Sequence, residues 1–251
     1  MGVDTANIPT SEDTLLGGRL RLIQRAKGHR AGSDAVLLAC AAPPEAQRIA
    51  DLGAASGAVG LMAAHLCPRA QVSLLEQEAA LVALARNNIA LNRLDSRVAA
   101  REVDAFRLGA QPDLREAFDA VLTNPPFFAP GATRVSPEPG RASAHHMAGD
   151  LRGWVSGVLT LLAPKGEAVM IHRADHVEAV LAAFSGRFGA ITLRFIHPRA
   201  QEAASRLIIA GIKGSRAPLS VLPALMLHEG EAFSATAKAL HAGEARFSTR
   251  P

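Results

Sequence analysis

The chain contains very little cysteine. Its two cysteines, Cys40 and Cys67, stand far apart and form no C-x-x-C pattern. This spacing predicts neither a disulfide framework nor a zinc site, and we expect no bound metal. The sequence also lacks a G-x-S-x-G elbow, so a serine hydrolase is not expected.

Long apolar segments are also missing. No apolar run is long and uninterrupted enough to span a bilayer, and residues 1–13 lack the apolar core of a signal peptide. We therefore expect a cytoplasmic protein without a membrane partner. Apolar residues make up 49% and charged residues 20% of the chain, as in ordinary globular proteins. The net charge of +4 permits an anionic partner without requiring one.

Apolar runs bounded by proline and glycine predict alternating strands and helices. Strands are expected at 48–52, 71–75, 98–103, 118–123, 167–171, 191–196 and 207–212. Helices are expected at 34–39, with Ser33 as N-cap, and at 57–66, 78–91, 151–162, 174–184 and near 236–241. Residues 15–30, with Gly17-Gly18, predict a hairpin with an arginine-rich edge. Strands separated by helices predict an α/β protein with a mainly parallel sheet covered on both faces.

The segment Asn124-Pro125-Pro126-Phe127 is expected directly after a buried strand, where open α/β sheets bind their ligands. Proline stiffens the segment and has no N–H, so it presents carbonyl acceptors without competing donors. The Asn124 amide oxygen, the Pro125 carbonyl and the Phe127 ring together suit a flat heterocycle with an exocyclic amine. The alternative is a rigid turn with no chemical role.

A glycine-rich turn is expected after the first core strand, from Asp51 through Gly53 to Gly57. Such a turn lets the backbone approach a ligand, and the following helix offers free N–H groups. Glu76 ends the next strand, where a carboxylate accepts from ribose hydroxyls. A dinucleotide enzyme is one interpretation, although the G-x-G-x-x-G fingerprint is absent. Asp104 ends the third strand and is either an adenine ligand or a loop acid.

Taken in order, these motifs resemble the S-adenosylmethionine-dependent amino-methyltransferases, and most closely the bacterial tRNA adenine-N(6)-methyltransferases acting on valine tRNA. Lys27 to Ala39 and His197 to Ala200 add to the resemblance, which covers residues 12 to 230 approximately. It implies a seven-stranded Rossmann-like methyltransferase domain with an antiparallel last strand at 45–251, and an N-terminal hairpin extension at 1–44. The family usually has glycine where this chain has Ala55, which costs on the order of 1 kcal/mol if φ is positive there.

The resemblance implies S-adenosylmethionine as cofactor and tRNA or another RNA as partner. Asn124, Pro125 and Phe127 are then catalytic, and the expected cofactor-binding residues are Asp51, Gly53, Gly57, Glu76, Asp104, Ala105 and Asn124. The hairpin arginines, with Arg134, Arg141 and Arg199, are expected to face RNA phosphates. The alternatives are guanine methylation in rRNA, glutamine methylation in a protein, and a non-catalytic binding module. Trp154 is expected to be a core residue.

Overall fold

The computed structural model describes residues 9–27, 30–126 and 151–251, and the architecture below refers to them. Seven principal strands form one sheet in the order β5-β4-β3-β6-β7-β9-β8. All neighbours are parallel except that β9 runs antiparallel to β7 and β8. The strands are β3 (Arg48–Leu52), β4 (Gln71–Glu76), β5 (Val98–Glu102), β6 (Phe118–Thr123), β7 (Leu162–Arg173), β8 (Phe188–His197) and β9 (Arg206–Lys213). The predicted seven-stranded fold is confirmed.

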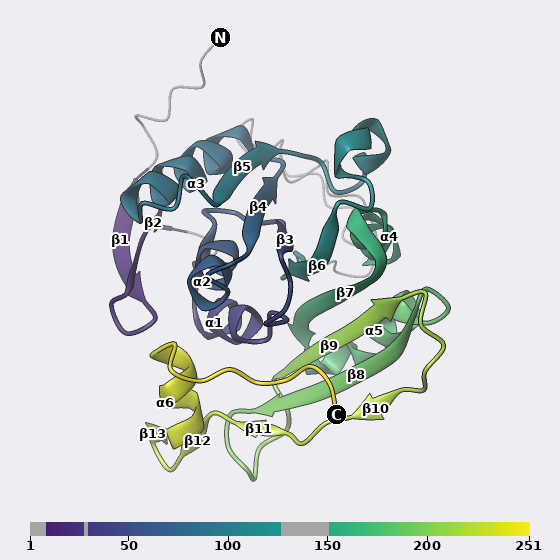
Figure 1. Cartoon of the computed structure of the whole chain (residues 1–251). Coiled ribbons are helices and arrows are strands. Elements are labelled where there is room, and N and C mark those ends of the chain that lie inside the picture. The colour runs from purple at the N-terminus through teal and green to yellow at the C-terminus, as the bar shows by residue number, and fades with distance from the viewer. Residues whose placement is uncertain (1–8, 28–29, 127–150) are drawn as a thin grey trace, which may run out of the picture.

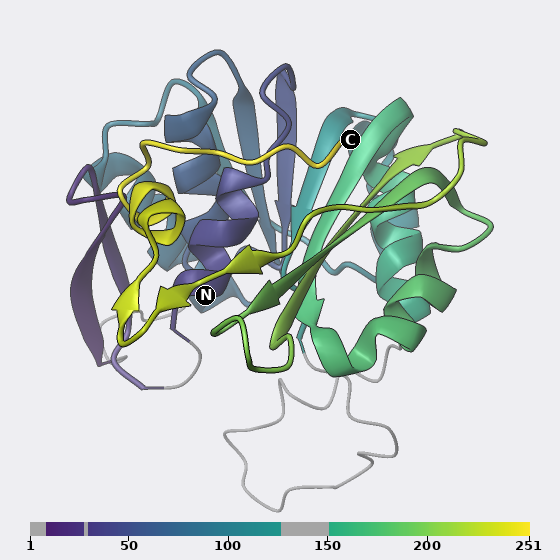
Figure 2. The same cartoon turned by 90° about the horizontal axis from the view of Figure 1, so that it is seen from below.

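Helices cover both faces of this sheet (Figures 1 and 2). On one face α1 (Ser33–Cys40), α2 (Ala58–Leu66) and α3 (Ala79–Leu91) share one hydrophobic cluster with the sheet. On the other face α4 (Leu151–Leu161) and α5 (Val177–Phe184) share a second cluster. Burial of each large aliphatic side chain in these clusters contributes roughly 1.5–3 kcal/mol. The domain boundary at residue 44 stays a prediction.

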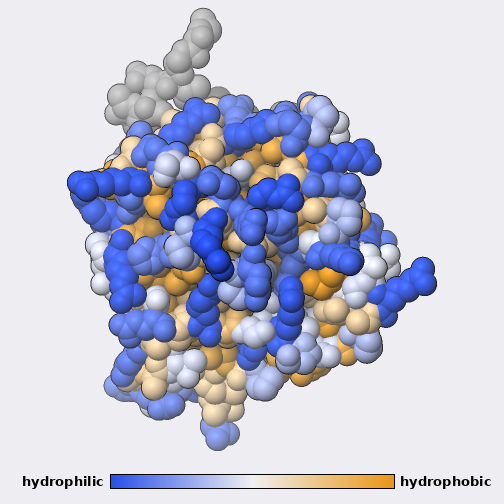
Figure 3. Space-filling view, in the orientation of Figure 1, coloured by the Kyte–Doolittle hydropathy of each residue, from blue (hydrophilic) through white to orange (hydrophobic). Residues whose placement is uncertain are grey.

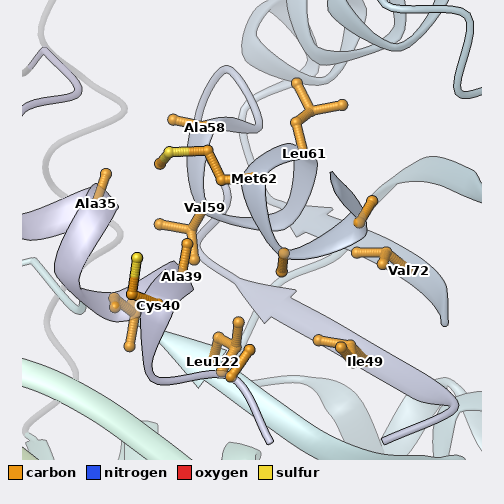
Figure 4. Packing of buried hydrophobic residues seen from close by; sticks show 14 of the residues in the cluster. Ala35, Ala39, Cys40, Ile49, Ala58, Val59, Leu61, Met62, Val72 and Leu122 are labelled. Carbon is orange, nitrogen blue, oxygen red and sulfur yellow. The ribbon is translucent and has the colours of Figure 1, made fainter. Parts of the chain in front are cut away.

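Small residues let α1 and α2 approach each other closely. Figure 4 shows Ala35 and Ala39 of α1 near Ala58 and Val59 of α2, with Met62 beside them. All five side chains are buried. This close packing places the first turn of α2, which follows the glycine-rich turn, on a rigid base.

The predicted hairpin is present and starts earlier than expected. Its strands are β1 (Thr10–Leu15) and β2 (Leu20–Arg25), and Gly17 and Gly18 both have positive φ in the turn between them. Figure 1 shows the hairpin beside α3, at the edge of the molecule.

Several local expectations need correction. The N-cap of α1 is Gly32, so Ser33 is the first helical residue and makes no capping bond. The strand predicted at 167–171 extends over the whole of β7, and a short 3-10 helix, Ala174–His176, precedes α5. Further short elements were not predicted: the 3-10 helices Leu108–Ala110 and Pro112–Leu114, and the strands β10 (Ser220–Val221), β11 (Leu225–Met226), β12 (His228–Glu229) and β13 (Ala232–Phe233).

The C-terminal tail is ordered against the sheet, although only its helix α6 (Ala235–His241) was expected. Figures 1 and 2 show the tail leaving α6 and crossing toward β7 and β8. Glu167 of β7 is 2% exposed, and its carboxylate accepts from the Thr249 hydroxyl and from Arg250 Nη2 at 2.9 Å. The Thr192 hydroxyl of β8 donates to the Thr249 carbonyl at 2.6 Å. We call these tail contacts the C-terminal clasp.

Figure 3 shows hydrophilic side chains over most of one face of the molecule. None of the described helices has the length and apolar character needed to cross a bilayer.

Candidate active site

The predicted site residues follow neighbouring parallel strands, so they meet at one edge of the sheet. Leu52 of β3 pairs with Leu75 of β4 and with Thr123 of β6. The next residues, Gly53, Glu76 and Asn124, therefore lie at the carboxyl ends of three adjacent strands. Ligands bind at this edge in open α/β sheets.

The turn between β3 and α2, residues 53–57, is called the cofactor turn here. Three of its residues have positive φ: Gly53 at 77°, Ala55 at 48° and Gly57 at 93°. The N–H groups of Gly53 and Ala54 donate to the Leu75 carbonyl at 2.9 and 3.1 Å, which ties the turn to β4. The φ of Ala55 is thus positive, and the predicted cost applies. Residues with a side chain disfavour this left-handed conformation.

Glu76 lies beside this turn with only 9% of its surface exposed. Its Oε2 accepts from the Ala55 N–H at 2.9 Å, and its Oε1 accepts from the Glu78 N–H at 3.0 Å. An ionised carboxylate has about four acceptor positions, so each oxygen keeps capacity for another donor. The group is thus oriented by the backbone and still able to accept from two hydroxyls.

Asp51 lies in β3 before the turn, and its side chain is buried and not accessible at the edge of the sheet. It is 1% exposed, and its Oδ2 accepts from the Gly60 N–H in the first turn of α2 at 2.8 Å. Burial raises the pKa of Asp51 to about 7, against the lowering effect of the Gly60 bond and with a smaller raising effect from Glu76. This position fixes α2 to β3, so any effect of Asp51 on a cofactor is exerted through the turn above it.

Asp104 and Ala105 form the loop after β5. Asp104 Oδ1 accepts from the Phe106 N–H at 2.8 Å, while its other oxygen lies 3.6 Å from Arg107 Nε. The Asp104 side chain is 35% exposed, so it remains accessible to a ligand amine. Ala105 is buried, and a Cβ added at Gly157 of α4 would lie 2.5 Å from its carbonyl oxygen. Helix α4 therefore packs closely against this loop.

The end of β6 carries the predicted catalytic segment. Asn124 is partly buried, and no described residue forms a hydrogen bond with its side chain. Pro125 is buried directly after it. Phe127 lies outside the described residues, so its predicted role is not tested by the structure.

Trp154 and Thr123 connect the cofactor turn with the end of β6, and this contact was not predicted from the sequence. Trp154 Nε1 donates to Thr123 Oγ1 at 2.9 Å, and Thr123 Oγ1 donates to the Leu52 carbonyl at 2.8 Å. A Cβ added at Gly53 would lie 3.0 Å from Cζ2 of the same indole. Trp154 is buried as predicted, but it also braces the cofactor turn and the residue before Asn124. The polar Thr123 at the end of an apolar strand was the available signal.

The two acceptor carboxylates and the glycine-containing turn suit S-adenosylmethionine, the cofactor that the resemblance implies. Glu76 would hold the ribose hydroxyls, Asp104 the adenine amine, and Gly53 and Gly57 give the backbone room to approach. Asp51, Ala105 and Asn124 complete the residues expected around the cofactor. These assignments remain proposals, because they rest on position and chemistry.

Metal ligands do not gather in the described part of the chain. His172 and His176 stand four residues apart and their ring centroids lie 5.2 Å from each other. Among the described residues, however, no group of three or more His, Cys, Asp or Glu side chains is placed to hold an ion. Burial lowers the pKa of His172, which favours its neutral form.

The arginines expected to face RNA are mostly in ion pairs. Arg21 pairs with Glu12 at 2.6 Å within the hairpin, and Arg199 pairs with Glu202 at 2.7 Å. The other arginines of the predicted hairpin segment form the pairs Arg19–Glu244, Arg25–Glu78 and Arg30–Asp13. Arg134 and Arg141 lie outside the described residues. Contact of these arginines with phosphate therefore stays a prediction, and it would require exchange of carboxylate partners.

Comparison with known proteins identifies relatives for this geometry. The family of the methyltransferase small domain matches residues 28–138. A tRNA1(Val) (adenine(37)-N6)-methyltransferase of Shewanella sediminis is 31% identical over 172 residues, which are 66% of this chain and 69% of that protein. The enzyme of the same name from Aeromonas hydrophila is 29% identical over 186 residues, 72% of this chain and 75% of that protein.

A solved structure from Agrobacterium tumefaciens, described as a predicted O-methyltransferase, is 31% identical with a TM-score of 0.72. The match covers 86% of this chain and 98% of that chain. Sequence and structural relatives thus agree on a methyltransferase domain. The chain belongs to the tRNA1(Val) (adenine(37)-N6)-methyltransferase family and is an S-adenosylmethionine-dependent methyltransferase.

Proposed function

We propose that this protein methylates the exocyclic 6-amino group of an adenine in RNA, with tRNA as the substrate class. The observation that carries the proposal is the place of Asn124 and Pro125. They follow Thr123, which pairs with Leu52 immediately before the cofactor turn. An amide oxygen and a carbonyl oxygen thus stand next to the residues proposed to hold S-adenosylmethionine. An RNA substrate also supports the expected cytoplasmic location.

S-adenosylmethionine supplies an electrophilic methyl group when bound. The residues of the chain supply orientation and charge stabilisation. Asn124 Oδ1 and the Pro125 carbonyl would accept the two hydrogens of the amine, which favours a pyramidal nitrogen with its lone pair free. The same two acceptors stabilise positive charge that develops on nitrogen, as preorganised dipoles do in other enzymes. The base must leave its stack to reach these groups.

An amine substrate explains this segment better than a hydroxyl, although one structural relative is described as an O-methyltransferase. Two acceptors suit the two hydrogens of an amine, whereas a hydroxyl has one hydrogen to give. Guanine in rRNA and glutamine in a protein also present an NH₂ group. They are the alternative substrates.

The decisive experiment compares wild type with Asn124→Ala on radiolabelled S-adenosylmethionine with total RNA or total protein. We expect label in N6-methyladenosine with the wild type. In Asn124→Ala we expect turnover to fall by about a hundredfold or more, cofactor affinity to fall much less than turnover, and the melting temperature to stay nearly unchanged. Label in N2-methylguanosine or in protein would replace the substrate assignment. A folded, cofactor-bound variant with wild-type rate would remove Asn124 from catalysis.

A further inference from the structure

The N-terminal hairpin is attached to α3 through two asparagine side chains. Asn88 Oδ1 accepts from the Ile23 N–H at 2.7 Å, and its Nδ2 donates to the Ile23 carbonyl at 2.7 Å. Likewise, Asn92 Oδ1 accepts from the Arg21 N–H at 2.9 Å, and Asn92 Nδ2 donates to the Arg21 carbonyl at 2.7 Å. Each amide therefore satisfies both backbone groups of one residue of β2.

The two asparagines differ in their remaining hydrogen bond. Asn92 Nδ2 also donates to the Asn88 carbonyl at 2.8 Å, which stays within α3. Asn88 is fully buried, and its Nδ2 also donates to the Ser56 carbonyl at 2.9 Å. Since Ser56 belongs to the cofactor turn, one side chain joins the hairpin to that turn.

A second connection runs from the end of β2 to the acidic residue of the site. The guanidinium of Arg25 pairs with the carboxylate of Glu78. The backbone N–H of Glu78 in turn donates to Glu76 Oε1 at 3.0 Å. The hairpin is thus linked to the turn through Asn88, and it directly contacts Glu78, whose N–H positions the proposed ribose carboxylate.

We propose that the hairpin is part of the support of the cofactor site, and that Asn88 is the positioning residue that couples the two. Ser56 stands between Ala55 and Gly57, which both have positive φ. Local backbone preference does not hold Ala55 in this conformation, so hydrogen bonds from neighbours must do so. The inference rests on the assignment of the cofactor to this turn. Because coupling is reciprocal, cofactor binding must also stabilise hairpin docking.

The matched test compares Asn88→Ala with Asn92→Ala. Both variants lose the two bonds to β2, so both should lower the melting temperature. Only Asn88→Ala loses the bond to the cofactor turn. Calorimetric titration should therefore give an affinity for S-adenosylmethionine about tenfold weaker in Asn88→Ala, and the KM for the cofactor should rise more than kcat falls. Asn92→Ala should stay within about twofold of wild type.

A second pair of variants avoids the buried position. Arg25→Gln removes the pair with Glu78, whereas Arg21→Gln removes a pair with Glu12 that lies within the hairpin. We expect about threefold weaker cofactor binding in Arg25→Gln and no change in Arg21→Gln. Equal affinities within both pairs of variants would overturn the coupling.

Hydrogen exchange tests the reverse direction. Adding S-adenosylhomocysteine to the wild type should slow exchange in residues 20–25 of the hairpin, and Asn88→Ala should lose this protection. Absence of protection in a wild type that binds the cofactor would contradict the coupling alone. A wild type that binds neither S-adenosylmethionine nor S-adenosylhomocysteine would contradict the proposed function instead.

Discussion

The backbone N–H of Ala55 donates a hydrogen bond of 2.9 Å to Oε2 of Glu76, and Ala55 has a φ of 48°. The carboxylate thus stabilises a backbone conformation that an alanine disfavours. At the same time the N–H of Ala55 orients the carboxylate. One hydrogen bond therefore serves both the shape of the cofactor turn and the placement of the proposed ribose ligand.

Replacement of Glu76 should weaken the cofactor site. We expect Glu76→Ala to lower the affinity for S-adenosylmethionine by roughly 1.5–3 kcal/mol, because hydrogen bonds to a charged group are lost. Glu76→Gln, which keeps one acceptor, should lose less. Calorimetry measures both, with Glu102→Ala, on the exposed end of the neighbouring strand β5, as control. Unchanged affinity in a folded Glu76→Ala would contradict the ribose assignment.

Replacement of Ala55 by glycine should make the folded protein more stable. Glycine adopts positive φ without a Cβ clash, so Ala55→Gly should raise the free energy of unfolding by up to about 1 kcal/mol. Ala190→Gly is the matched control, since Ala190 also has a φ of 48° but lies in β8, away from the site. Thermal melting should reveal stabilisation in both variants. Cofactor affinity should change only in Ala55→Gly, and a loss of stability there would refute strain at this residue.

The buried Asp51 should make stability depend on pH. Its pKa of about 7 in the folded protein lies above the ordinary aspartate value, so the native state keeps a proton that the unfolded chain releases. Stability from this group is present at low pH and is lost as pH rises from about 4 through 7. Asp51→Asn removes that loss, and its amide oxygen can still accept from Gly60.

The measurement is urea unfolding of wild type and Asp51→Asn at several pH values between 5 and 8. The stability of the variant relative to wild type should increase as pH rises. Parallel pH profiles for the two proteins would show that Asp51 does not carry the raised pKa.

The C-terminal clasp should matter for stability and leave chemistry alone. Deletion of residues 249–251 removes both described partners of the buried Glu167 carboxylate. Unpairing a buried charge costs about 3 kcal/mol or more. The same deletion in a Glu167→Gln background should cost less, because no charge is stranded. Urea unfolding of the four proteins gives the coupling, and additive effects would speak against the clasp.

The seven principal strands could be predicted from the sequence because most of them are apolar runs between breaker residues, as 118–123 illustrates. The two-residue strands β10 to β13 were not predicted, because they are too short to carry a pattern. Trp154 was expected to be core and is buried, but its bond to Thr123 depends on two elements meeting in space. The role of Asn88 could not be predicted from the sequence either, because its two partner residues, Ile23 and Ser56, lie in distant parts of the chain.

The two asparagines of α3 also show how a helix can stand in for a neighbouring strand. Four residues along an α-helix advance about 6 Å, and two residues along a β-strand advance about 6.8 Å. The step from Asn88 to Asn92 therefore matches the step from Ile23 to Arg21, and each amide donates to the carbonyl of its residue at 2.7 Å. Such commensurate spacing fixes the hairpin in one register. It also closes this edge of β2 to pairing with another chain, which protects the molecule from edge-to-edge aggregation.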